Sequence, residues 1–379
     1  MVSYMIPLMT RALVRVFCYH TTMFWADRVV QEIEQSRGKG GRLIVRDEKT
    51  ASGRVHIGSM RGVAVHGLVA RVLNDRGTQA DFLYEINDFD PMDGIPAELP
   101  ASEWEQYLGM LLNKVPSPDG RATNFAEYYA SEFIEVIKGT GFDPKFYRGS
   151  ELYLNGKMND VIKIALTRAA DIRRIYLEVS GSKKVDNWLP ISMICAKCGK
   201  IGTTVAHGFD GKDVYYKCIA GAGGAVGCGH EGHGSPFDGG GKLPWKAEWP
   251  AKWKVLNVAV EGAGKDHSTK GGARDVANHI SKEVFGFEPP HDIPYEFFLD
   301  HEGKKMSSSK GRGASAREIA DNFPPAIFRL ALFGKDPNQQ FNIDPMGETL
   351  ATLYDWHDKI AEKFWDGVGD DDARLFDLA

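Results

Sequence analysis

The hydrophobic positions of the first ninety residues alternate between helical and extended spacing. Trp25, Val29 and Ile33 fall on one helical face, and the glycines of residues 38–41 end that helix. Residues 42–46 form a short apolar run that predicts a buried strand. After a turn, a second helical pattern runs to Gly77, and residues 81–86 predict the next strand. The core stripe of the second helix is Met60, Val63, Ala64, Gly67, Leu68 and Val72.

This order of strand, glycine-containing loop, helix and strand is typical of the start of a doubly wound parallel sheet, which binds a nucleotide above its first loop. Aromatic positions predict a helix over residues 125–137, and a long helical stretch follows at 158–179. The pattern of the sheet resumes with a strand over 255–260 and a helix that opens at Gly271. The sequence therefore predicts an α/β, Rossmann-like fold.

Composition narrows the class of protein. The 379 residues leave room for two or three domains, and 43% hydrophobic with 26% charged residues is ordinary for a globular chain. The net charge of −5 gives no overall basic surface, so nucleic-acid binding would need a local patch. No apolar run reaches the roughly 18 residues that span a bilayer. We expect a cytoplasmic protein without a membrane partner.

The first 22 residues differ from the rest, because they combine apolar residues with Arg11 and Arg15 and contain no acidic residue. Such a segment is compatible with a targeting sequence, with an upstream start codon before Met23, or with an N-terminal extension. We favour the extension.

Four of the five cysteines cluster in the middle of the chain, which favours a metal site in a reducing compartment over a disulfide framework. Cys195 and Cys198 have the spacing of a zinc knuckle, and Cys218 and Cys228 complete a set of four thiolates. Nine residues separate the second pair, so His230 is a possible substitute for one thiolate. A complete set leaves no open position, and the predicted zinc is therefore structural.

Two loops carry residues suited to a nucleotide triphosphate. His56 lies between Gly53 and Gly58 where a helix begins, so it can donate to phosphate oxygens while the backbone approaches the ligand closely. About 250 residues later, the segment 304–311 reads Lys-Lys-Met-Ser-Ser-Ser-Lys-Gly. Its hydroxyls and ammonium groups suit the charge that develops during phosphoryl transfer.

The pair of motifs, His56-Ile57-Gly58-Ser59 and then Lys305 to Lys310, resembles the two signatures of the class I aminoacyl-tRNA synthetases. Further motifs are similar to the class I, archaeal-type lysyl-tRNA synthetases: residues 24–27 (Phe-Trp-Ala-Asp), 88–91 (Asp-Phe-Asp-Pro) and 264–267 (Gly-Lys-Asp-His). The chain departs from that family at Ser59, where Asn is usual, and at Glu48 and Ala51, where Gly and Pro are usual.

The resemblance implies a set of functional residues. It implies catalytic roles for His56, Lys305 and Lys310. The implied ATP-binding residues are Ser52, Gly53, His56, Ile57, Gly58, Ser59, Gly264, Asp266, His267, Lys305, Met306, Ser307, Ser308 and Ser309. The implied amino-acid-binding residues are Thr50, Asp88, Trp245, His267 and Tyr295. A lysine pocket also needs a carboxylate for the ε-ammonium, and the sequence does not choose among Glu48, Asp88, Glu261 and Asp266.

The resemblance also implies a two-step reaction with ATP, Mg²⁺, lysine and the acceptor stem of tRNA(Lys). The expected units are an extension (1–22), two halves of the catalytic domain (23–189 and 241–322), a zinc insertion (190–240) and a helical C-terminal region (323–379). The anticodon-binding domain usual in the family is expected to be absent. Three interpretations follow: a lysine–tRNA ligase, a lysine-activating enzyme with another acceptor, or a silent RNA-binding or regulatory relative.

Overall fold

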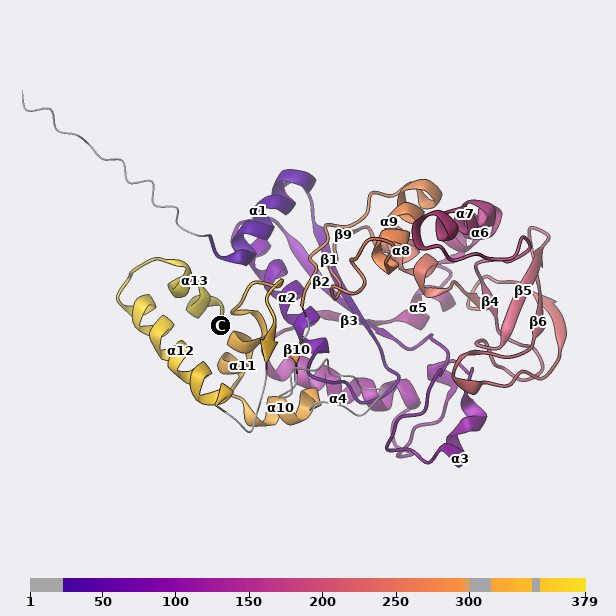
Figure 1. Ribbon diagram of the computed structural model, residues 1–379, viewed down its shortest axis with the longest axis horizontal. Coiled ribbons are helices and arrows are strands. Elements are labelled where there is room, and N and C mark those ends of the chain that lie inside the picture. Colours follow the sequence, from indigo (N-terminus) through magenta and orange to yellow (C-terminus); the bar gives the residue numbers. More distant parts are fainter. Residues whose placement is uncertain (1–22, 297, 300–314, 343–347) are drawn as a thin grey trace, which may run out of the picture.

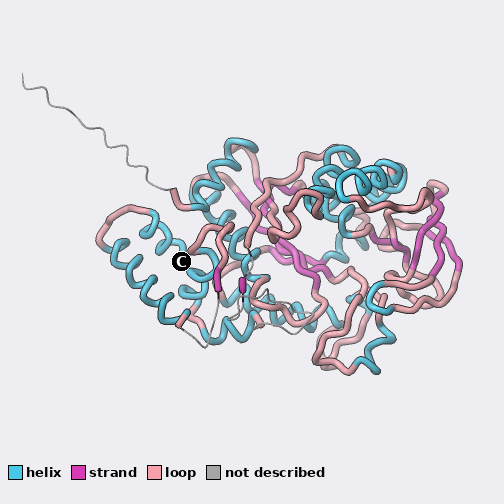
Figure 2. Tube along the Cα trace, viewed as in Figure 1, coloured by secondary structure: helices cyan, strands magenta, loops and turns pink. Residues whose placement is uncertain are grey.

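A computed structural model describes residues 23–296, 298–299, 315–342 and 348–379. The expected extension and the segment 304–311 lie outside this range. A parallel sheet occupies the middle of the molecule, with a small antiparallel sheet on one side and the C-terminal helices on the other (Figure 1). Helices surround the central sheet, and loops connect most elements of the antiparallel part (Figure 2).

The central sheet has the strand order β3-β2-β1-β9, and all three of its pairings are parallel. Its strands are β1 (Leu43–Thr50), β2 (Ala80–Asn87), β3 (Lys145–Arg148) and β9 (Val258–Val260). β1 and β2 pair over their whole length and end together, with Thr50 opposite Asn87. The predicted doubly wound α/β fold is confirmed, and the carboxyl ends of its strands form one edge where ligands bind in such folds.

Side chains of β1 alternate between two covered faces of the sheet. Asp47 lies toward His66 of α2 (Ser59–Asp75). Arg46 contacts Glu85 on the other face, where Lys252 of α8 (Trp245–Leu256) joins them. Both faces of β1 are therefore buried, as expected for a strand in the middle of a parallel sheet.

Three predicted boundaries were wrong. The strand expected over residues 42–46 continues to Thr50 as β1. The strand expected over residues 255–260 begins only at Val258, because the four-residue spacing of the tryptophans continues a helix through Leu256. Asn257 then ends the helix in the left-handed conformation, with φ at 52°. The helix expected over 158–179 is broken near Arg168 into α6 (Asn159–Thr167) and α7 (Ala169–Ser180).

Residues 190–242 form the antiparallel part, in which β5, β6 and β7 pair in order and β4 pairs with β8. This part packs against the segment that follows β2, because the backbone N–H groups of Ile201 and Gly202 both donate to the carbonyl of Gly109. The bounds are β4 (Ser192–Met193), β5 (Thr204–Phe209), β6 (Val214–Cys218), β7 (Glu231–Gly234) and β8 (Gly241–Lys242).

The C-terminal helices pack on the first two helices of the chain. The indole of Trp25 donates to the carbonyl of Phe333, and the buried guanidinium of Arg61 donates to the carbonyls of Leu332 and Asp336. These helices are α10 (Ala316–Asn322), α11 (Pro325–Phe333), α12 (Thr349–Trp365) and α13 (Asp371–Leu378).

The other elements complete the chain. The α-helices are α1 (Trp25–Arg37), α3 (Ala101–Trp104), α4 (Phe125–Gly139), α5 (Gly149–Leu154) and α9 (Ala273–Ile280). The short helices are η1 (Glu105–Tyr107), η2 (Leu112–Lys114), η3 (Ala222–Gly224) and the π-helix η4 (Ser281–Phe285). The last strands, β10 (Phe298–Leu299) and β11 (Phe341–Asn342), pair with each other. Among the described residues, no helix is long and apolar enough to cross a bilayer.

A network of buried charges lies inside the central sheet. The fully buried Arg46 donates to Glu48, to Glu85 (2.6 Å), to Glu261 (2.5 Å) and to the hydroxyl of Tyr147. Lys252 adds a second cation, whose Nζ lies 2.6 Å from Glu85. These two cations hold the pKa of Glu85 at about 2 in spite of the opposing effect of its burial.

We expect Glu85→Ala to lower the free energy of unfolding by about 3–5 kcal/mol, because it leaves two buried cations without a shared partner. Urea denaturation followed by circular dichroism measures this loss. Asp81→Ala on the same strand is the matched control, since Asp81 pairs with Arg42 and Lys145, whose side chains are 54% and 65% exposed. The control should lose no more than about 1 kcal/mol. Equal losses in the two variants would contradict a structural role for the buried network.

Candidate functional site

A cavity of about 400 Å³ opens at the carboxyl ends of β1 and β9. Three segments far apart in the sequence form its walls: the end of β1 with the start of α2, the start of α8, and the loop after β9 with Tyr295. The lining residues are Asp47, Glu48, Lys49, Thr50, His56, Gly58, Ser59, Trp245, Trp249, Glu261, Gly262, Ala263, Gly264, Asp266, His267 and Tyr295.

The loop between β1 and α2 holds His56 against the backbone. A Cβ at Gly58 would lie 2.7 Å from two atoms of the His56 imidazole, so a side chain at this position would displace the ring. Gly58 is also the residue from which α2 begins, which places the imidazole beside the positive end of the helix. Glycine at this position therefore leaves room for the imidazole beside a helix N-terminus, a position that suits an anion.

The segment after residue 314 returns to this loop. Ser315 forms an antiparallel bridge with His56, and the N–H of Ala316 donates to the carbonyl of Val55 at 2.9 Å. On the other flank, Tyr295 lines the cavity. The described residues on both sides of the predicted Lys305–Lys310 loop are thus anchored at the cavity. The predicted site residues Lys305, Met306, Ser307, Ser308, Ser309 and Lys310 themselves lie outside the described residues.

The loop after β9 is fixed by a histidine and an aromatic stack. His66 accepts a hydrogen bond from the N–H of Gly262 at its Nε2 (2.7 Å), which ties α2 to this loop. His267 packs edge-on against Trp245, with ring centroids 5.2 Å apart. Trp245 in turn stacks on Trp249 at 5.6 Å. One wall of the cavity is therefore aromatic, which suits an aliphatic stem or a base.

The structure brings most of the described predicted residues together. Those that line the cavity are Thr50, His56, Gly58, Ser59, Trp245, Gly264, Asp266, His267 and Tyr295. Ser52, Gly53 and Ile57 do not line it. Ile57 is fully buried and belongs to the hydrophobic core, so its side chain holds the loop in place rather than facing a ligand.

Asp88 needs correction, because it is not among the lining residues. Its carboxylate accepts hydrogen bonds from the backbone N–H (2.8 Å) and the hydroxyl (2.6 Å) of Ser150. These bonds anchor the start of α5 beneath the sheet edge. Asp90, its neighbour in the same motif, accepts from Thr50 at 2.8 Å and pairs with Lys242. Both aspartates therefore stabilise segments next to the cavity and do not line it themselves.

Sequence reasoning missed five lining residues, which are Asp47, Lys49, Trp249, Gly262 and Ala263. Asp47 and Lys49 share one face of β1, as the two-residue period of a strand requires. Two charged residues at the carboxyl end of a buried strand were a signal that could have identified them. Burial raises the pKa of Asp47 to about 6, and it lowers the pKa of Lys49.

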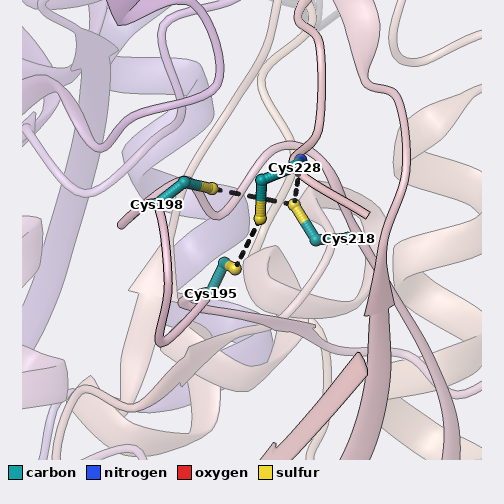
Figure 3. A group of neighbouring side chains, drawn as sticks. All are labelled: Cys195, Cys198, Cys218 and Cys228. Atoms are coloured by element: carbon teal, nitrogen blue, oxygen red, sulfur yellow. Dashed lines mark hydrogen bonds between the residues drawn. The ribbon is translucent and has the colours of Figure 1, made fainter. Parts of the chain in front are cut away.

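A second candidate site lies in the antiparallel part. The sulfur atoms of Cys195, Cys198, Cys218 and Cys228 all lie within 4.8 Å of one another (Figure 3). Gly199 takes a positive φ of 74°, and its N–H donates to the carbonyl of Cys195, which closes the predicted knuckle. The cluster can hold a metal ion with four sulfur ligands.

The second pair of cysteines reaches the cluster through a tight glycine loop. A Cβ at Gly221, Gly223 or Gly227 would lie 1.9–2.2 Å from a backbone oxygen of another segment, so none of the three tolerates a side chain. The backbone N–H of His230 lowers the pKa of the Cys228 thiol to about 7, which favours the thiolate that binds metals. The His230 ring packs edge-on near Tyr216, and the four thiols form the cluster without it.

Comparison with known proteins agrees with this architecture. Residues 23–376 match the profile of a family described as tRNA synthetases class I (K). The chain is 36% identical over 363 residues to a protein named lysine–tRNA ligase from Methanosarcina barkeri, and 33% identical over 342 residues to one of the same name from Archaeoglobus fulgidus. The two alignments cover 94% and 90% of this chain, and 65% and 66% of those relatives.

Among solved structures, a tyrosyl-tRNA synthetase from Archaeoglobus fulgidus matches 76% of this chain and 69% of its own, with 16% identity and a TM-score of 0.39. The family profile, by contrast, spans nearly the whole chain, from before α1 to the last helix. The chain belongs to the class I tRNA synthetases, in the family denoted K.

Proposed function

We propose that this protein activates lysine with ATP to form lysyl-adenylate and then transfers the lysyl group to tRNA(Lys). The observation that carries the proposal is the single cavity at the edge of the sheet, which is lined both by His56 and Gly58 and by the loop of Asp266 and His267. The curated relatives that share these segments are named lysine–tRNA ligases, and this chain spans about 65% of their length.

Each wall of the cavity suits a different part of the two substrates. The N–H groups at the start of α2, with His56, suit the phosphates of ATP, which this family uses together with Mg²⁺. The aromatic wall of Trp245 and Trp249 suits the methylene stem of lysine. In the first step, a carboxylate oxygen of lysine attacks the α-phosphorus, and the bond from that phosphorus to the oxygen of the leaving pyrophosphate breaks. In the second step, a ribose hydroxyl of tRNA attacks the lysyl carbonyl, and AMP leaves.

This reaction requires neither a covalent nucleophile nor a dedicated general base. The protein contributes position and charge: it aligns the two reactants and stabilises the negative charge that grows on the phosphate oxygens. A wholly silent RNA-binding relative would not need the close packing of Gly58 on His56. A lysine-activating enzyme with another acceptor uses the same cavity, and the acceptor must be tested directly.

The test is amino-acid-dependent exchange of pyrophosphate into ATP, with each of the twenty amino acids and then with tRNA. We expect exchange with lysine, and transfer of labelled lysine to tRNA(Lys). Exchange with lysine but no transfer to tRNA would favour a lysine-activating enzyme that uses another acceptor. A folded protein that exchanges with no amino acid would overturn the proposal.

His56→Ala should lower the kcat of lysine-dependent exchange by roughly 100-fold or more, with the KM for lysine nearly unchanged, because His56 is proposed to act on the phosphates. The control is His279→Ala on α9, since His279 is half exposed and pairs with Glu283 on the same helical face. The control should keep wild-type kinetics. A rise in KM for lysine without a change in kcat would instead place His56 at the amino acid.

We further propose that the four-cysteine cluster holds one structural Zn²⁺. Four thiolates are the ligands that zinc prefers in closed, tetrahedral sites. The surrounding segment supports this, because the glycine loop between Cys218 and Cys228 is held by backbone bonds and contains little hydrophobic core of its own. The metal would fold this part of the chain rather than take part in the reaction.

Metal analysis of the purified protein should find about one zinc per chain. Cys198→Ser should lose the metal and unfold at a lower temperature, because it removes one ligand from the cluster. Cys18→Ser, at the cysteine that lies far from the other four in the sequence, is the matched control and should keep both metal and stability. Full zinc occupancy in the Cys198→Ser variant would show that the metal is bound elsewhere.

A further inference from the structure

Four carboxylates of the described residues line the cavity, and the structure distinguishes them by their interactions and exposure. They are Asp47, Glu48, Glu261 and Asp266. A substrate with an ammonium group needs a carboxylate whose charge is not already neutralised by the protein, since a buried cation requires an anionic partner. The distances around each carboxylate therefore indicate which of them can receive the ligand.

Two of the four are committed to the buried network. Glu48 accepts from Arg46, and its Oε2 lies 3.5 Å from Nζ of Lys252. Glu261 accepts from Arg46 at 2.5 Å and from the indole N–H groups of Trp249 (2.7 Å) and Trp253 (3.0 Å). Both carboxylates already accept from cationic or hydrogen-bonding groups of the protein, so we assign them to the buried network.

The third carboxylate is too exposed to select a ligand by charge. The side chain of Asp266 is 42% exposed, and its Oδ1 lies 3.8 Å from Nε2 of the equally exposed His267. An ion pair in such a solvated position contributes little free energy. Asp266 therefore does not distinguish a cationic side chain from a neutral one.

Asp47 differs from the other three. Its side chain is only 11% exposed, and no lysine or arginine nitrogen of the described residues lies within 4.0 Å of its oxygens. The nearest basic group is Nδ1 of His66, at 3.8 Å from Oδ2. That nitrogen lies 2.7 Å from the carbonyl of Gly62, while Nε2 accepts from Gly262. With Nε2 as an acceptor, the N–H of Nδ1 is directed at the Gly62 carbonyl rather than at Asp47.

Asp47 faces the same small volume as the hydroxyl of Tyr295. A Cβ built on Gly62 would lie 2.6 Å from Oδ2 of Asp47 and 2.8 Å from the Tyr295 hydroxyl, so both oxygens lie beside Gly62. Both residues also line the cavity. An ammonium group carries three donors and matches a site with a carboxylate and a hydroxyl acceptor.

We propose that Asp47 and the Tyr295 hydroxyl bind the side-chain ammonium of the amino-acid substrate, and that they select lysine over neutral isosteres. This inference rests on the proposed function and adds its specificity determinant. Glu48 and Glu261, which the sequence left as alternatives, position the strands beneath the site instead.

The first test is pyrophosphate exchange with lysine and with norleucine, which has the same carbon chain but no side-chain ammonium group. Asp47→Asn should lower kcat/KM for lysine by at least about 30-fold, because a buried charge pair loses one partner. It should leave the KM for ATP and the low activity with norleucine unchanged. Tyr295→Phe removes only the hydroxyl. It should also lower kcat/KM for lysine, but by a smaller factor than Asp47→Asn.

Glu48→Gln is the matched comparison, since it removes a neighbouring carboxylate of the same strand. If Glu48→Gln rather than Asp47→Asn abolished the preference for lysine over norleucine, the assignment would be overturned. An equal loss with lysine, norleucine and ATP in Asp47→Asn would also overturn it, because it would mean a structural role. A wild-type protein without any lysine-dependent exchange would instead refute the proposed function.

Proton release gives a readout that does not depend on activity. The pKa of Asp47 is about 6, so near pH 6 half of the carboxyl groups carry a proton that a bound ammonium must displace. Lysine affinity should therefore fall as the pH drops below 6. The charged and titratable groups around Asp47 are Glu48, Lys49, His66, Glu261 and Tyr295.

Calorimetry at pH 6 in two buffers of different ionisation enthalpy measures this proton, with a non-hydrolysable lysyl-adenylate analogue as the probe. We expect release of roughly half a proton with the lysyl analogue, and none beyond background with the norleucyl analogue. The difference should vanish in Asp47→Asn. Equal release with both analogues would contradict the inference, because the ammonium would then not reach Asp47.

Discussion

The guanidinium of Arg46 is the group on which the candidate site is built. It is fully buried, and it joins β1 to β2 through Glu85, to β3 through Tyr147 and to the end of β9 through Glu261. A buried guanidinium is tolerated only when its donors are satisfied, so these partners must stay together. The four strands are thereby held together near the edge where the cavity opens. The position of each lining residue follows from this constraint.

Strand β1 contributes both to the charge network and to the cavity, because its successive side chains point to opposite faces of the sheet. Arg46 and Glu48 point toward α8 and complete the charge network, whereas Asp47 lies toward α2 and Tyr295. The network contains more carboxylates than cations, and its carboxylates still have hydrogen-bonding partners throughout. The cavity above it therefore combines a rigid, negative floor with one carboxylate, Asp47, that has no lysine or arginine nitrogen of the described residues within 4.0 Å. That combination suits a cationic ligand better than a neutral one.

The sequence predicted those parts of the site that depend on local geometry. His56 and Gly58 could be placed because glycines at a strand-to-helix turn let the backbone approach a ligand, whereas the Gly264–His267 loop was placed by its resemblance to a family motif. Asp88 could not be placed, because its partner Ser150 is distant in the sequence and close only in the fold. The end of α8 was misread for a similar reason: residues 255–260 are apolar except for Asn257, whose left-handed conformation separates helix from strand. Which carboxylates pair with a cation also depends on contacts between segments that are distant in the sequence, and Asp47 was therefore missed.

The cysteine cluster and the cavity are linked by contiguous contacts rather than separated by a flexible joint. The knuckle between Cys195 and Ile201 leads to backbone bonds from Ile201 and Gly202 to Gly109. The segment around Gly109 is bonded in turn to Met92 and Asp90, and Asp90 accepts from Thr50 in the cavity wall. Each of these bonds joins buried or half-buried residues, so the antiparallel part and the segment that supports the cavity constrain each other. The proposed structural metal would therefore also stabilise the wall of the cavity next to Thr50.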